Sequence, residues 1–309
     1  PEASWFLTRR PRQGRNGKNH MKGILLAGGS GTRMLPLTAS LNKQLLPVYN
    51  KPMVYYPLST LMLAGAREVL VITSPGDRQL FERLLGDGSR LGISIRYAAQ
   101  ERPGGIAEAL IIGSDFAADE RVALALGDNV FYGAGFADCI DRAGKRQEGA
   151  TVFACEVEDP ERFGIVELDG GGAPVRIVEK PAEPASNLAV TGLYFYDRQA
   201  VEIARSLEPS ARGELEITDV NQAYLDRGQL RVETLPEDTR WLDTGTHESL
   251  LQASTEIMDF EKNSASLAGS IEETAFRMGF IDLGQLRTLA EELKGSDYGR
   301  LLLERAVQD

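Results

Sequence analysis

From Met21 onward, short apolar segments alternate with segments of helical periodicity. The apolar segments that read as strands are 22–27, 68–73, 93–98, 122–127 and 151–157. The segments between them that read as helices are 52–65, 77–85, 105–117 and 135–147. The first and fourth strands are apolar almost throughout, which is typical of strands buried on both faces. This strand–helix–strand order predicts parallel βαβ units with helices on both faces of one sheet.

The pattern changes after residue 160, where strand-like segments follow one another more closely. The strand-like segments in this part are 164–168, 175–180, 188–196 and 230–235, and the interleaved helical segments are 197–206 and 216–227. We interpret them as a mixed extension of the same sheet. Residues 246–308 read as helical almost throughout. We therefore predict an α/β fold with a mixed, mostly parallel central sheet flanked by helices. Residues 21–262 would form the main domain and residues 263–309 a helical C-terminal extension.

The N-terminal segment 1–20 does not belong to this pattern. It lacks apolar periodicity and carries five basic side chains and one acidic side chain. It is either a vector-derived or upstream-translated extension, expected to be mostly disordered, or a basic targeting arm. We therefore exclude it from the fold argument.

Composition excludes several classes of protein. The net charge is −11, and clustered basic residues, on which nucleic-acid binding depends, are missing from the acidic main part. No apolar run approaches the roughly 18 residues of a membrane-spanning helix, and nothing near the N-terminus resembles a secretory signal. The two cysteines, Cys139 and Cys155, have no metal-ligand spacing, which argues against a disulfide scaffold or zinc domain and fits a reducing compartment. We expect a cytoplasmic protein that binds neither nucleic acid nor membrane.

The first predicted strand leads into a glycine-rich segment, LAGGSGTRMLPLT at 26–38. Such a loop at the carboxyl end of a buried strand can present backbone N–H groups to a polyphosphate. The dinucleotide-binding fingerprint fails, because Met34 stands where its last glycine would be and no acid occurs between Met34 and Glu68. The P-loop pattern also fails. It needs Lys and then Ser or Thr directly after its last glycine, but Gly31 is followed by Thr32 and Arg33.

The glycine-rich segment and six later motifs resemble the sugar-1-phosphate nucleotidyltransferases, and within that family the thymidylyltransferase branch. The later motifs are KQLLPV at 43–48, LGDN at 126–129, EKP at 179–181, TGLYFY at 191–196, GELEITD at 213–219 and WLDTG at 241–245. The resemblance covers 21–308 and implies a Rossmann-like nucleotidyltransferase fold for the catalytic domain, sugar-binding portion included. It also implies the reaction, in which dTTP and α-D-glucose 1-phosphate give dTDP-glucose and pyrophosphate, the first step towards dTDP-rhamnose or other dTDP-deoxysugars.

The resemblance also assigns roles to residues on the nucleotide side. The residues implied to bind the nucleotide are Gly28, Gly29, Gly31, Thr32, Arg33, Gln44, Gln100 and Gly105. Among them, Arg33 is expected to stabilise the departing pyrophosphate, with Lys43 as a second catalytic cation. The chain departs from many relatives at Gly104 and Glu108, where they carry Asp and Gln. These differences add a charge near the base or ribose and weaken the expectation of strict base selection.

On the sugar side, the resemblance implies binding by five residues, namely Gly164, Glu179, Lys180, Val190 and Arg212. Asp128 and Asp243 are implied to bind the catalytic Mg²⁺, which suits a cation that takes one or two carboxylates together with phosphate oxygens. Where relatives often carry Tyr, this chain has Phe163, so any contact through that hydroxyl is lost.

The C-terminal extension resembles the segment that lies between subunits in bacterial thymidylyltransferases. The resemblance therefore implies a homotetramer with feedback by dTDP-rhamnose, although Ala134-Gly135 stands where relatives often carry His. Two alternative functions remain open. One is a UTP-using uridylyltransferase, because thymine and uracil differ only by a methyl group. The other is a non-catalytic nucleotide-sensing subunit, against which the presence of Arg33, Lys43, Asp128 and Asp243 argues.

Overall fold

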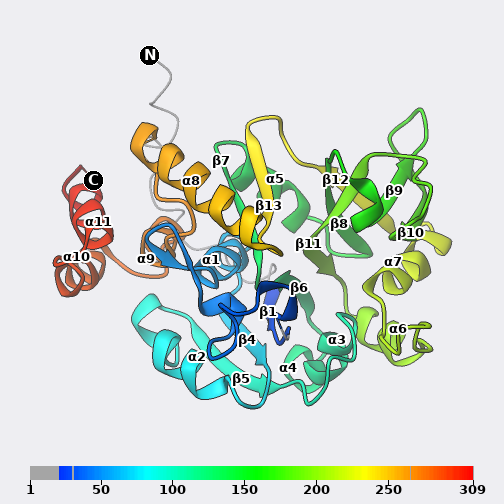
Figure 1. Ribbon diagram of the computed structural model, residues 1–309, viewed down its shortest axis with the longest axis horizontal. Helices are drawn as coiled ribbons and strands as arrows, with labels where there is room; N and C mark the ends of the chain where they lie inside the picture. Colours follow the sequence, from blue (N-terminus) through cyan, green and yellow to red (C-terminus); the bar gives the residue numbers. More distant parts are fainter. Residues whose placement is uncertain (1–20, 30, 265, 309) are drawn as a thin grey trace.

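The computed structural model describes residues 21–29, 31–264 and 266–308 (Figure 1). The extension expected at 1–20 lies outside these residues. The strands of the main sheet are β1 (Met21–Ala27), β4 (Glu68–Thr73), β5 (Ser94–Ala99), β6 (Arg121–Leu126), β8 (Ala150–Glu156), β9 (Gly164–Leu168), β10 (Pro174–Glu179), β11 (Leu188–Tyr196) and β12 (Leu230–Thr234). They confirm every predicted strand to within one residue at each end.

The main sheet has a parallel half and a second half, called the antiparallel half below, in which every pair except β8–β12 is antiparallel. Its order is β10-β9-β11-β6-β1-β4-β5, with β8 pairing both β11 and β12. Strands β5, β4, β1 and β6 run parallel, whereas β11 is antiparallel to β6, β8 and β9. Because β11 pairs with β6 of the parallel half, the strands after residue 160 extend the same sheet, as predicted.

Helices cover both faces of this sheet, and alternate strand residues enter the two cores. Leu25 of β1 belongs to one core and Ile24 to the other, as the two-residue period of a strand requires. On the Leu25 face lie α1 (Tyr55–Leu63), α2 (Arg78–Leu85) and α5 (Phe136–Gly144). On the Ile24 face lie α3 (Glu108–Ile112), α4 (Ser114–Ala117), α6 (Ala200–Arg205) and α7 (Ile217–Asp226).

The single helix predicted at 105–117 is wrong, because the chain forms a turn and then two short helices. The interruption lies at Gly113, where a Cβ would stand 2.7 Å from Ile24 Cδ1 of the sheet below. The apolar periodicity of this segment predicted which face is buried. It could not predict how closely the backbone at Gly113 approaches β1.

Two small strand pairs escaped the sequence analysis. They are β2 (Pro47–Val48) with β3 (Lys51–Pro52), and β7 (Asn129–Gly133) with β13 (Thr239–Asp243). Each strand is short, and the partners β7 and β13 are far apart in the chain. Periodicity within one segment therefore could not reveal the pairing.

The C-terminal region is helical, as predicted. It consists of α8 (His247–Asn263), α9 (Ile271–Arg277), α10 (Leu283–Glu292) and α11 (Asp297–Gln308), which lie together at one end of the molecule (Figure 1). The side chains of Thr246, Ser270 and Asp282 cap the first three of these helices. Helices α9–α11 contribute to the same core as α1, so the predicted extension packs on the main domain of its own chain. Within the described residues, no helix is both long enough and apolar enough to cross a membrane.

Candidate active site

The parallel strands bring three predicted site segments to one edge of the sheet. In the register of β1 and β6, Leu26 pairs with Leu126, and Gly127 N–H donates to the Leu26 carbonyl over 2.8 Å. On the other side of β1, Gln100 N–H donates to the Thr73 carbonyl, also over 2.8 Å, at the ends of β5 and β4. The glycine-rich loop, Gln100 and Asp128 therefore start from the same edge, where ligands of open α/β sheets bind.

Two glutamine amides lie beside the glycine-rich loop. A Cβ on Gly28 would lie 3.0 Å from Gln100 Oε1, and one on Gly29 would lie 4.0 Å from Gln44 Nε2. Gly31 has a φ of +60° and leads into a short 3₁₀ helix that carries Thr32 and Arg33. The two amides thus lie close to the loop, and a side chain on Gly28 would crowd the Gln100 amide.

A second short 3₁₀ helix, Lys43–Leu45, carries Lys43 and Gln44 inward. Asn42 fixes its start, because Asn42 Oδ1 accepts from Gln44 N–H at 2.9 Å and Asn42 Nδ2 donates to the Ala27 carbonyl at 3.2 Å. Among the described residues, Gln44 Oε1 is one of few buried polar side-chain atoms without a hydrogen-bond partner. A buried acceptor left unpaired is costly, which makes Gln44 a candidate for ligand contact.

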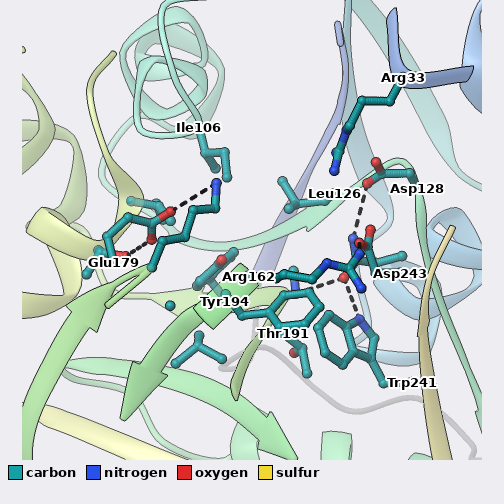
Figure 2. Close-up of a pocket in the computed structure, with 18 residues that line it drawn as sticks. Arg33, Ile106, Leu126, Asp128, Arg162, Glu179, Thr191, Tyr194, Trp241 and Asp243 are labelled. Carbon is teal, nitrogen blue, oxygen red and sulfur yellow. Dashed lines mark hydrogen bonds and ion pairs between the residues drawn. The ribbon is translucent and has the colours of Figure 1, made fainter. Parts of the chain in front are cut away.

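A cavity of about 440 Å³ opens beside this edge, between the parallel and antiparallel halves of the sheet (Figure 2). Its lining consists of Arg33, Ile106, Leu126, Asp128, Asn129, Arg162, Phe163, Gly164, Glu179, Lys180, Val190, Thr191, Gly192, Tyr194, Ile217, Thr218, Trp241 and Asp243. Figure 2 shows Arg33, Asp128 and Asp243 on one side of the cavity and Glu179 on the other.

The β7–β13 pair brings the two predicted metal ligands together. Asp243 lies opposite Asn129 in the antiparallel register, which puts it beside Asp128. Thr244 locks the junction, since its Oγ1 donates to the Asp128 carbonyl at 2.8 Å. Lys43 Nζ lies 2.6 Å from Asp128 Oδ2. The structure therefore assembles two carboxylates and a lysine at the boundary between loop and cavity.

The two carboxylates differ in their titration. Burial alone would raise the pKa of Asp128, but the Lys43 ammonium and hydrogen bonds from Lys43 and Asn129 outweigh it and hold that pKa below its ordinary value. Burial and the charge of Asp128 raise the pKa of Asp243, against the opposing charges of Lys43, Arg33 and Arg162. A cation placed between them would relieve the repulsion that raises the pKa of Asp243.

The antiparallel half supplies the opposite wall of the cavity. Glu179 ends β10, and its Oε2 accepts from Thr218 Oγ1 at 2.6 Å. The next residue, Lys180, has a φ of +43°, a backbone conformation that is strained for any residue other than glycine. Residues with such strained backbones often occur at functional sites. Lys180 Nζ lies 3.5 Å from Glu179 Oε1. A Cβ on Gly164 would stand 3.3 Å from both Glu179 Oε2 and Thr218 Oγ1, so this position leaves space in the wall.

Most of the predicted site residues fall into two neighbouring groups. Those that line the cavity are Arg33, Asp128, Gly164, Glu179, Lys180, Val190 and Asp243. Those that lie along the strand edge beside it are Gly28, Gly29, Gly31, Thr32, Gln44, Gln100 and Gly105, with Lys43 bonded to Asp128. Arg212 lies outside the lining: it pairs with Glu216 at 2.9 Å and reaches Glu179 only at 3.5 Å. The structure thus keeps the predicted set together and leaves Arg212 at its margin.

Arg162 is a cavity residue that the sequence analysis missed. Its Nη2 lies 3.6 Å from Asp243 Oδ2, and its guanidinium stacks 5.2 Å from the Phe163 ring centroid. The Phe163 ring in turn packs edge-on against Trp241, whose Nε1 donates to Asn129 Oδ1 at 2.6 Å. One indication was present in the sequence, since Arg162 lies only two residues before the predicted sugar-binding residue Gly164. The proximity of Arg162 to Asp243 could not be predicted, because the two residues are far apart in the chain.

Comparison with known proteins gives a consistent answer. Residues 22–259 match the family model described as nucleotidyl transferase. A glucose-1-phosphate thymidylyltransferase of Mycolicibacterium smegmatis is 55% identical over 284 residues, covering 92% of this chain and 98% of that protein. A solved structure assigned as a glucose-1-phosphate thymidylyltransferase of Bacillus anthracis, in complex with sucrose, has a TM-score of 0.72 and 40% identity over 78% of this chain and 96% of that one. A UDP-glucose pyrophosphorylase complexed with UDP-glucose has a TM-score of 0.66 and 25% identity over 78% of this chain and 99% of that one.

Proposed function

Because this chain belongs to the nucleotidyl transferase family, we propose that it transfers a thymidylyl group from dTTP to α-D-glucose 1-phosphate, giving dTDP-glucose and pyrophosphate. It is an enzyme of nucleotide-sugar biosynthesis. The observation that carries the proposal is that the glycine-rich loop and the cavity meet at one pair of carboxylates. A nucleotide triphosphate on one side and a sugar phosphate on the other would react at this junction.

The chemistry requires charge control rather than a general base. The second pKa of a phosphate monoester is about 6, so the attacking oxygen of glucose 1-phosphate is already mostly ionised at neutral pH. This oxygen attacks the α-phosphorus of dTTP, and the bond to pyrophosphate breaks. Two anions must therefore be brought into line, and positioning together with electrostatic stabilisation supplies the catalysis.

On the nucleotide side, the loop and two cations hold the triphosphate. Backbone N–H groups around Gly28, Gly29, Gly31 and Thr32 contact phosphate oxygens. Arg33 is exposed at the mouth of the cavity, and its planar fork suits the departing pyrophosphate. The Lys43 ammonium, 2.6 Å from Asp128 Oδ2, supplies the second cation beside the phosphates. Gln44, Gln100 and Gly105 face the base.

On the sugar side, Lys180 holds the phosphate and Glu179 accepts hydrogen bonds from sugar hydroxyls. The main chain at Gly164 and Val190, which line the cavity, lies along the hexose. Arg212 supports Glu179 from the margin, at the 3.5 Å separation of that pair. Arg162 adds a cation near Asp243 and makes this wall attractive to a phosphate.

The carboxylates of Asp128 and Asp243 fit a bound Mg²⁺. Both line the cavity and both are oxygen ligands, and a bound cation would offset the charge of Asp128 that raises the pKa of Asp243. When bound, the ion would neutralise charge on the α-phosphate. Asp128 and Asp243 would hold the ion in place, and Thr244 fixes the backbone of Asp128.

The decisive experiment measures pyrophosphate release with glucose 1-phosphate and each of dTTP, UTP, dCTP, ATP and GTP. We expect dTTP to be used best, UTP more slowly, and purine nucleotides poorly, because a purine would be too wide for a base pocket closed by Gln44, Gln100 and the turn at 103–105. Faster turnover of UTP than of dTTP would favour a uridylyltransferase. The absence of turnover with every nucleotide would favour a nucleotide-sensing subunit.

We extend the proposal to assembly and location. The chain forms a homotetramer through its helical extension, receives feedback from dTDP-rhamnose, and works in the cytoplasm, where its free Cys139 and Cys155 stay reduced. Light scattering after size-exclusion chromatography tests the tetramer, and titration of dTDP-rhamnose into the assay tests the feedback. A monomer, or an enzyme indifferent to dTDP-rhamnose, would contradict these two points.

A further inference from the structure

Glu108 and Gln100 form a direct contact at the end of β5. Gln100 Nε2 donates to Glu108 Oε2 at 2.7 Å and to the Gly105 carbonyl at 3.1 Å. A carboxylate and a backbone carbonyl only accept hydrogen bonds, so the NH₂ group of the amide must face them. The Gln100 amide therefore has one orientation, which chemistry fixes independently of how its nitrogen and oxygen are assigned.

The carbonyl oxygen of Gln100 consequently faces the other way. It lies against the glycine-rich loop, 3.0 Å from where a Cβ on Gly28 would stand. Gln100 is buried, with 7% of its surface exposed, so few other groups can reorient it. The nucleotide side of the site thus meets a hydrogen-bond acceptor at this position.

Gly104 provides the space that this arrangement needs. A Cβ on Gly104 would lie 2.3 Å from Glu108 Oε2 and 2.6 Å from Glu108 Cδ. The φ of Gly104 is outside the left-handed region, so the obstacle to a side chain here is the carboxylate and not the backbone. Gly104 and Glu108 therefore form a matched pair: the acid occupies the volume that a side chain at 104 would take.

We propose that Glu108 is a positioning residue that sets the base preference of the enzyme through Gln100. This inference rests on the proposed function. By holding the Gln100 carbonyl toward the base, Glu108 favours a pyrimidine that carries a hydrogen at N3, as thymine and uracil do. Cytosine presents a lone pair at N3, which the carbonyl repels. Glu108 acts on the choice of base and takes no part in the attack on phosphorus.

Glu108→Met tests the inference, because methionine keeps much of the volume and removes the acceptor. We expect KM and Kd for dTTP to rise about fivefold to tenfold, the loss of one hydrogen bond to an oriented partner. The preference for dTTP over dCTP should fall by a similar factor. The kcat and the KM for glucose 1-phosphate should stay unchanged. Glu108→Gln should recover most of the preference, since a glutamine oxygen can still accept from Gln100 Nε2.

Gly104→Ala provides a second, independent variant. Its methyl group should push the Glu108 carboxylate away and give the same loss of base preference without removing the acid. The double variant with Glu108→Met should be no worse than either single variant, because both act on one contact. Asp115→Asn, which removes an exposed acid from the neighbouring helix α4, is the matched control and should change nothing.

The outcomes separate the inference from the proposed function. If the wild-type enzyme uses dTTP and both variants fold yet keep the full preference over dCTP, the inference is wrong and the function stands. Additive losses in the double variant would also overturn it. If the wild type turns over no dTTP but its Kd values favour dTTP, and Glu108→Met abolishes that difference, the function is wrong and the inference stands.

Discussion

Two buried lysines close together in the sequence make the same contact in two different regions. Lys43 Nζ lies 2.6 Å from Asp128 Oδ2 in the active site, and Lys51 Nζ lies 2.7 Å from Glu261 Oε1 between β3 and α8. The side chains of the first pair are 7% and 24% exposed, and those of the second pair are 1% exposed each. The active-site pair, called the open pair below, is therefore accessible from the cavity through its Asp128 carboxylate. The Lys51–Glu261 pair, called the sealed pair, is almost fully enclosed by protein.

The surroundings explain what each pair can do. Around Lys51, Asn50 Oδ1 accepts a hydrogen bond at 2.7 Å, and the rings of Tyr56 and Tyr298 lie 5.2 and 5.3 Å from Nζ. Burial lowers the pKa of Lys51, although Glu261 opposes that change. No outside group can reach a pair enclosed in this way, so the sealed pair ties α8 to the β2–β3 hairpin. Beside Lys43, the second carboxylate and the open cavity allow a phosphate or cation to compete for the same charges.

The largest effect should come from the open pair. Asp128→Asn and Asp243→Asn should each lower kcat more than about a thousandfold, or about 4 kcal/mol, because a carboxamide keeps the shape of the cation ligand without its charge. Pyrophosphate release at saturating dTTP and glucose 1-phosphate measures the loss. EDTA should silence the wild type, and Mg²⁺ or Mn²⁺ should restore it.

Thermal unfolding of the same variants provides the control for folding. Glu202→Gln, which removes an exposed acid on α6 outside the cavity lining, should leave turnover unchanged. Either aspartate variant retaining full activity would leave the proposed charge stabilisation without support.

The sealed pair should instead be decisive for stability. Lys51→Met should lower the free energy of unfolding by about 3–5 kcal/mol, because it leaves the Glu261 carboxylate buried without its cation. Denaturant unfolding measures this loss. The kcat of the protein that remains folded should change little, since Lys51 is outside the cavity lining.

The double variant Lys51→Met with Glu261→Met sharpens the comparison. It should regain most of the lost stability, because replacing both members of a buried ion pair by apolar side chains is often nearly neutral. A double variant as unstable as Lys51→Met alone would show that the other contacts of Lys51 matter more than its charge.

A third prediction concerns the two walls of the active site. Lys180→Ala should raise the KM for glucose 1-phosphate about tenfold to a hundredfold, as expected for the loss of a charge-assisted hydrogen bond, with much less change in the KM for dTTP. Steady-state kinetics with each substrate varied in turn measures both constants. Lys145→Ala, which removes an exposed lysine paired with Asp141, is the matched control. Equal changes in both KM values would argue against a role specific to the sugar phosphate.

The smallest effect concerns pH. A carboxyl must be ionised to hold a cation, and the raised pKa of Asp243 means that activity is lost on the acidic side at a higher pH than for an ordinary aspartate. Arg162→Ala removes one of the charges that lower this pKa, so the acidic limb of kcat/KM should move to higher pH. The shift should be modest, because Arg162 is 42% exposed and solvent screens its charge. Arg176→Ala should leave the limb in place, and movement toward lower pH would contradict the assignment.

Much of the fold and part of the site could be predicted from local sequence. Near-continuous or alternating apolar residues in the strands of the main sheet predicted which strands are buried. The position of the glycine-rich segment directly after the first strand predicted a loop at the end of β1. The pairing of β7 with β13 could not be predicted, because its short strands interact across a long separation. Arg162 was missed for the same reason, since its importance depends on Asp243, which only that pairing brings near.

The sequence by itself determined the alternation of strands and helices, the glycine-rich loop, and the residue types that suit phosphate and metal. These depend on neighbours along the chain, through backbone freedom and the periodicity of burial. Only the tertiary structure decided that Lys43 faces an open carboxylate and Lys51 a sealed one, and that Gln100 donates a hydrogen bond to Glu108. These differences depend on which groups from distant parts of the chain contact a side chain once folding has excluded water from it. They also depend on whether a cavity lies beside that contact.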